Sequence, residues 1–74
     1  MASKPDRDIE KDYPLPDFVE KLRRLADAIE NGDRFTISIA GERVHVPSRA
    51  QYNLEHERGA GGEEIEFQIK WRPE

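Results

Sequence analysis

Residues 63–71, EEIEFQIKW, alternate polar and apolar side chains and end on the only tryptophan of the chain, Trp71. Because successive side chains of a β-strand point to opposite faces, this alternation predicts a strand with one polar and one apolar row. The apolar row, which includes Ile65, Phe67 and Ile69, has to be covered by another part of the fold. The partner of this row therefore decides which architecture the chain can adopt.

The hydrophobic period changes to that of an α-helix over residues 17–31. An apolar stripe with helical spacing is formed by Phe18, Leu22, Leu25 and Ile29. Gly32 follows and can take the left-handed conformation that ends many helices. The sequence predicts no other amphipathic helix, so we expect this stripe to pack against the apolar rows of the strands.

Four further segments have strand character. RFTISIA and RVHV are expected to form a hairpin with a two-residue turn at Gly41 and Glu42, which sets Ile39 opposite Val44. YNLEHER and the opening segment are expected to pair through the flexible GAGG reversal. Residues 7–13 alternate with charges on both faces, which is typical of an edge strand.

These elements predict an α+β fold, in which a single, mainly antiparallel sheet of four to five strands carries one amphipathic helix on one face (β-α-β-β-β-β). Residues 1–6 are expected to be a flexible tail and residues 7–74 a single domain. A chain of 74 residues has a marginal core, so the additional burial of a homodimer would stabilise it.

The segments ISIAGERVHV, LEHE and EEIEFQIKW, in this order after a helix, resemble the amphi-Trp domain family of prokaryotic proteins. The resemblance covers residues 7–72 and implies a fold with amphipathic strands and a terminal tryptophan, here Trp71. It implies no activity. Pro14 and Pro16, before the helix, depart from the usual Ser or Thr cap.

Composition narrows the classes of function. A net charge of −4, spread over charges of both signs, disfavours unselective binding to nucleic acid or to anionic membranes. The apolar runs are far shorter than the roughly 20 residues that span a bilayer, and we expect a cytoplasmic protein that does not bind membranes. With no cysteine and two histidines, the sequence predicts neither a disulfide nor a structural zinc site, and we expect no cofactor.

An enzyme is not expected either. In the predicted first hairpin Ser38 lies across from His45, which could be a nucleophile with its base. No donors for an oxyanion accompany the pair, so a solvated hydrogen bond is the favoured interpretation. Trp71 has two interpretations, as the edge of the core or as an exposed anchor for a partner, and its position in the apolar row favours the core.

The polar face of the sheet carries the strongest functional signal. Four carboxylates, from Glu55, Glu57, Glu64 and Glu66, are expected on neighbouring strands, with Arg43 opposite Glu55 and His45 opposite Asn53. Such a face could dock a basic segment, hold a divalent cation weakly, or only solvate the sheet. The candidate binding residues are Ser38, Arg43, His45, Glu55, Glu57, Glu64 and Glu66.

The sequence thus favours a small, non-enzymatic protein-interaction or adaptor module that uses its open polar sheet face or an edge strand. The partner protein is not identified by the sequence, and a homodimer is one possibility. The alternative is binding of a small ligand, a cation or nucleic acid on the same face, with nucleic acid the less favoured because of the acidic charge.

Overall fold

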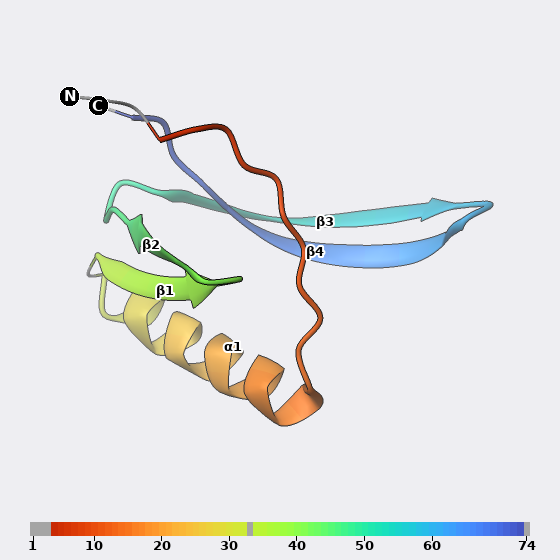
Figure 1. The fold of residues 1–74 in the computed structure, drawn as a ribbon, viewed down its shortest axis with the longest axis horizontal. Coiled ribbons are helices and arrows are strands. Elements are labelled where there is room, and N and C mark those ends of the chain that lie inside the picture. The colour runs from red at the N-terminus through yellow and green to blue at the C-terminus, as the bar shows by residue number, and fades with distance from the viewer. Residues whose placement is uncertain (1–3, 33, 74) are drawn as a thin grey trace.

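The computed structural model describes residues 4–32 and 34–73 and consists of one helix followed by two β-hairpins (Figure 1). The elements, in chain order, are α1 (Leu15–Glu30), β1 (Phe35–Ile39), β2 (Glu42–Val46), β3 (Gln51–Gly59) and β4 (Gly62–Lys70). Strand β1 pairs with β2 and β3 pairs with β4, both antiparallel, as two separate two-stranded sheets. The α+β class is confirmed, but the arrangement differs from the single sheet that we expected.

Helix α1 begins two residues before the predicted start. Pro14 is its N-cap, and the backbone amide of Phe18 donates to the Pro14 carbonyl over 3.0 Å. Pro16 fits the first turn because its missing N–H would have no helical partner there. The helix ends as predicted, with Gly32 at a φ of 73° and its amide donating to the Ile29 carbonyl.

The N-terminal segment does not form the predicted strand: residues 7–13 lie outside any strand. Side chains hold this segment in place. The Arg7 guanidinium donates to the Ile39 carbonyl at 2.5 Å and lies 3.4 Å from the Glu42 carboxylate, and the backbone amide of Ala40 donates to the Tyr13 hydroxyl. With charges on both of its faces, the segment offers no apolar row that strand pairing would bury. The expected tail, residues 1–6, lies partly outside the described residues.

The predicted register of the first hairpin is wrong by two residues. Ile37 lies opposite Val44 and Ile39 opposite Glu42, so the turn residues are Ala40 and Gly41. Both have positive φ, 47° and 84°. Two positive φ values define a type I′ turn, whereas the Gly41–Glu42 turn that we expected would have been a type II′ turn, with glycine in the first position.

The core is small and lies at the connection between the two hairpins. Among the described residues only Val46 and Ala50 are buried apolar side chains. Helix α1 lies against β1, and no other element of the described chain packs on the helix. Pro47 follows β2 directly and cannot donate a ladder hydrogen bond, so pairing stops there and the chain turns, with the Ala50 amide donating to the Pro47 carbonyl.

The β3–β4 hairpin therefore projects away from the helix and from the first hairpin (Figure 1). Its apolar row, which we expected to be covered by α1, is exposed instead: Leu54 is 69% exposed, Ile65 70% and Phe67 66%. The expectation that these side chains face the core is wrong. The single sheet that we expected would have placed this row over the helix, but β2 does not pair with β3.

Candidate functional site

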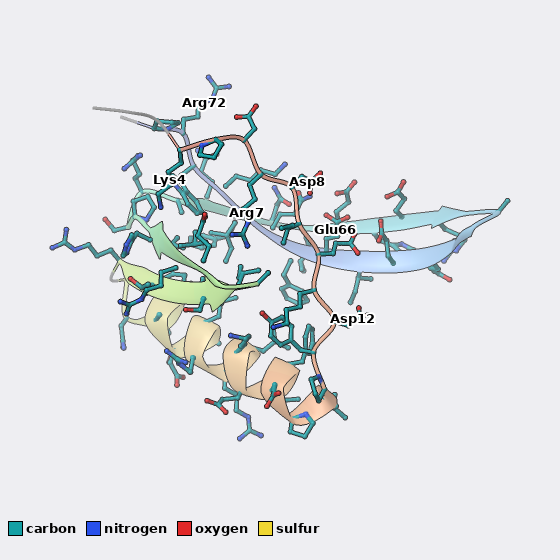
Figure 2. The ribbon with its side chains drawn as sticks, viewed as in Figure 1. Lys4, Arg7, Asp8, Asp12, Glu66 and Arg72 are labelled. Carbon is teal, nitrogen blue, oxygen red and sulfur yellow. The ribbon has the colours of Figure 1, made fainter. Side chains whose placement is uncertain are left out.

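The second hairpin carries the predicted carboxylates in the predicted arrangement. Glu55 lies directly opposite Glu66, and Glu57 opposite Glu64, on the polar face of the β3–β4 sheet. The apolar rows and the GAGG reversal, with Gly59 opposite Gly62, fix this register. In Figure 2 the tip half of the hairpin extends beyond the rest of the chain, with side chains projecting from both faces.

A neutral amide separates the first pair of carboxylates. The Gln68 side-chain amide donates to Oε2 of Glu55 and to Oε2 of Glu66, each at 2.9 Å. A cation, Arg43 opposite Glu55, was expected beside these carboxylates instead. Gln68 was missed because its place in EEIEFQIKW shows only that its side chain lies on the polar face. That its amide can reach both Glu55 and Glu66 follows only from the register of the two strands.

The second pair lies closer to the tip and repels more strongly. Carboxylate oxygens of Glu57, Glu64 and Glu66 lie within 4.8 Å of one another. The pKa of the Glu64 carboxyl is raised, first because a hydrogen bond with the Glu57 side chain favours its protonated form and then because the Glu66 charge repels its anion. Oxygen ligands at this spacing are chemically suited to a divalent cation, although exposed carboxylates of this kind are also common on solvated surfaces.

The tip of the same hairpin holds, on the opposite face, an ion-paired group that was not predicted from the sequence. Glu63 Oε2 lies 2.7 Å from Nε2 of His56 and accepts from Nη2 of Arg58 at 2.8 Å. These contacts lower the pKa of the Glu63 carboxyl, the hydrogen bond with His56 contributing most. The direct pairing of Arg58 with Glu63 across the hairpin was available from the sequence through the GAGG turn.

Three predicted site residues lie elsewhere. Ser38, Arg43 and His45 belong to the first hairpin, and Ser38 lies opposite Arg43 rather than His45. The Nδ1 atom of His45 is 2.9 Å from the Thr36 hydroxyl. The proposed Ser38 and His45 pair is therefore wrong, and so are the predicted pairings of Arg43 with Glu55 and of His45 with Asn53, because β2 and β3 belong to separate sheets. The binding role of these residues stays a prediction.

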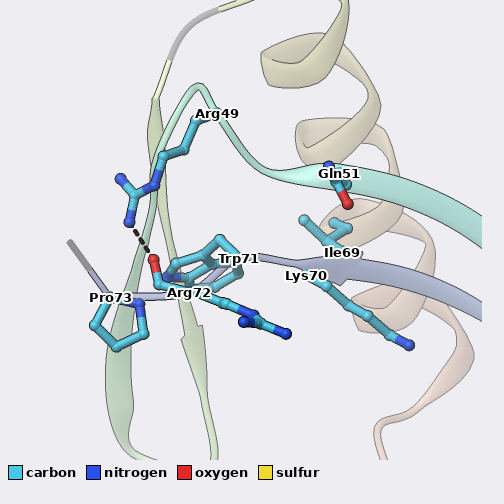
Figure 3. Close-up of a pocket in the computed structure, with 7 residues that line it drawn as sticks. All are labelled: Arg49, Gln51, Ile69, Lys70, Trp71, Arg72 and Pro73. Atoms are coloured by element: carbon cyan, nitrogen blue, oxygen red, sulfur yellow. Dashed lines mark hydrogen bonds between the residues drawn. The ribbon is translucent and has the colours of Figure 1, made fainter.

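A pocket at the base of the second hairpin differs from the acidic face in that its charged lining residues are all cations (Figure 3). Trp71 follows the end of β4 and is 37% exposed, so it closes the apolar row without entering a core. The Arg49 guanidinium donates to the backbone carbonyl of Arg72 across the pocket. The pocket is lined by Arg49, Gln51, Ile69, Lys70, Trp71, Arg72 and Pro73.

Among the described residues, no helix has the length and apolar content that crossing a membrane requires. Comparisons of the chain with protein-family models, with curated proteins and with solved structures found no match. The resemblance to the amphi-Trp family accordingly stays a prediction.

Proposed function

We propose that this chain is a small, non-enzymatic protein-interaction module whose contact surface is the β3–β4 hairpin. The proposal rests on one observation, the exposed apolar row of that hairpin. Tyr52, Leu54, Ile65 and Phe67 are between 48% and 70% exposed on a hairpin that, within the described chain, packs on no other element. Contiguous exposed aromatic and aliphatic side chains are typical of protein-binding surfaces.

The backbone of the hairpin supports the same proposal. Each strand of a two-stranded sheet has one unpaired edge, and β3 and β4 are both nine residues long. Long open edges pair readily with a strand of another chain unless something covers them. Side-chain and backbone groups on this hairpin are therefore both available to a partner.

The acidic polar face adds selectivity. Four glutamates on one sheet face favour approach of a basic protein segment and disfavour a polyanion such as nucleic acid. Binding of a small ligand, a cation or nucleic acid on this face is the competing function. Reversing the charge of Glu55 and Glu66 to lysine separates the two, because it should weaken a basic protein partner and strengthen a polyanion.

The test is a capture experiment from lysate of the source organism with matched variants. Leu54→Glu places a charge in the apolar row, whereas Asn53→Glu places the same charge on the opposite face one residue away. We expect wild type and Asn53→Glu to retain the same protein after nuclease treatment, and Leu54→Glu to lose it. Equal capture by both variants, or capture only of nuclease-sensitive material, would refute the hairpin as the protein-binding surface.

A further inference from the structure

The chain exposes much more surface than a compact monomer of its size. Its accessible surface is 6966 Å² at a mass of 8.6 kDa, whereas a folded monomer of that mass exposes about 4,700 Å². Its radius of gyration is 14.0 Å, against about 11 Å for a compact domain of this length. The excess of about 2,300 Å² lies in the range of about 1,000–2,500 Å² that each subunit of an obligate homodimer buries.

Much of the apolar part of this surface lies in one continuous strip. Leu54 is opposite Phe67 and His56 is opposite Ile65, and the row continues toward the base of the hairpin through Tyr52. These side chains share one face because they alternate with the polar row along both strands. The strip is therefore long enough to pack against a second sheet face, at the spacing of about 10 Å that packed sheets adopt.

The face of the strip carries little net charge near the tip, so a copy of the strip can approach it. Four of the glutamates of the hairpin, Glu55, Glu57, Glu64 and Glu66, lie on the opposite, polar face. On the face of the strip Glu63 is paired with His56 and Arg58. A two-fold axis perpendicular to the strands sets this paired tip beside the base of the other copy, whose pocket is lined by the cations Arg49, Lys70 and Arg72 (Figure 3), so no strong like charges meet.

We propose that the occupant of the apolar row is a second copy of this chain. The two β3–β4 hairpins pack face to face and antiparallel, about a two-fold axis near the Leu54 and Phe67 pair. The inference rests on the proposed function, because it names the partner of the same hairpin. It leaves the polar glutamate face and the open strand edges of the dimer free for other chains.

The rival occupants are the helix of the same chain and an unrelated protein. The first half of α1 is itself exposed and apolar, with Leu15 72%, Phe18 51% and Leu22 38% exposed. A hairpin that closed onto its own helix would cover both surfaces within a monomer. The second copy is favoured because the excess surface of the chain matches what each subunit of an obligate homodimer buries.

The experiment uses single cysteines, which are unambiguous because the chain has none of its own. Leu54→Cys lies near the proposed axis, and Asn53→Cys is its control on the opposite face. A bismaleimide with a reach of about 10 Å, the distance between packed sheets, should link two Leu54→Cys chains. We expect at least a tenfold lower yield of linked dimer for Asn53→Cys, because its thiols lie on the two outer faces.

Sedimentation equilibrium provides the second measurement. Wild type and Asn53→Glu should have twice the 8.6 kDa chain mass, and Leu54→Glu should fall to the mass of one chain. A monomeric wild type, or a dimer that Leu54→Glu leaves intact, would overturn the inference. If wild type is monomeric and Leu54→Glu still loses a captured protein, only the second copy is refuted and the proposed function stands. If neither self-association nor Leu54-dependent capture occurs, both fail.

Discussion

Shortening Leu54 to alanine should cost little stability in the isolated chain and several times more in the dimer. The substitution removes three carbon atoms, each worth about 0.8 kcal/mol when fully buried. Leu54 is 69% exposed in the single chain, so only about a third of that total, roughly 0.7 kcal/mol, is present there. Complete burial against a second copy raises the cost to about 2.4 kcal/mol per chain.

The difference appears in the dimer affinity. About 1.7 kcal/mol per chain is gained only on association, and a symmetric dimer contains the residue twice. Leu54→Ala should therefore weaken the dimer roughly 300-fold, since every 1.4 kcal/mol is a factor of about ten. In the proposed dimer the strip excludes water, because the neighbours of Leu54 are the apolar side chains of Phe67 and Ile65.

Denaturant unfolding at two protein concentrations, one below and one above the dissociation constant of the dimer, measures both values. The cost of Leu54→Ala should rise from below about 1 kcal/mol in dilute solution to above about 2 kcal/mol when concentrated. Asn53→Ala, on the outer face, should show no such dependence. A cost of more than about 2 kcal/mol in dilute solution would refute the reasoning, because Leu54 would then be buried within one chain.

Three further predictions concern the rest of the fold. Val46→Ala should lower the free energy of unfolding by about 2 kcal/mol in thermal or denaturant melts, because Val46 is one of the few buried side chains. Ala40→Asn should raise it by about 1 kcal/mol, since Asn tolerates the positive φ that precedes Gly41 in the turn; an unchanged melt would argue against the type I′ turn. Glu64→Gln should raise the melting temperature near neutral pH and leave it unchanged well below about pH 4. The sign follows from the raised pKa of Glu64, caused first by its hydrogen bond with Glu57: the folded chain holds the proton more tightly, so this contribution is present in acid and is lost as the pH rises through the raised pKa. A stabilisation by Gln that persists in acid would contradict the carboxylate repulsion.

Local patterns in the sequence predicted the elements well. The helical stripe and Gly32 located α1 to within two residues at its start and one at its end. The apolar rows of β3 and β4 place the four glutamates together on the polar face in either register that keeps these rows together. Which glutamates lie directly opposite each other is known only from the structure.

The register of the first hairpin was not predictable from the alternation of apolar and polar residues along β1 and β2. A slip of two residues keeps every side chain on the same face, so the apolar rows of β1 and β2 permit both registers. The turn decides between them, and here it uses Ala40 at a positive φ of 47°. Few residues other than glycine and asparagine adopt that conformation, so a sequence argument favours Gly41 in first place and misplaces the pairing.

The surface that covers the apolar row could not be predicted from the sequence, for a different reason. The alternation in EEIEFQIKW shows that one row of side chains is apolar, but it does not show which surface packs against that row. Helix α1 was the expected cover because it is the only amphipathic helix that the sequence predicts, but a surface of another molecule can cover the row equally well. The structure leaves both surfaces exposed, and the partner surface is then free to belong to another molecule.

The most direct measurement is an isotope-filtered NMR experiment on an equal mixture of labelled and unlabelled chains. Under the account given above, Leu54 methyl protons of the labelled chain show cross-peaks to the Phe67 ring of the unlabelled one. Cross-peaks from Leu54 that arise only within one chain, and that lead to Phe18 or Leu22 of α1, would contradict it. The hairpin would then pack on its own helix, and its apolar row would not be an interaction surface.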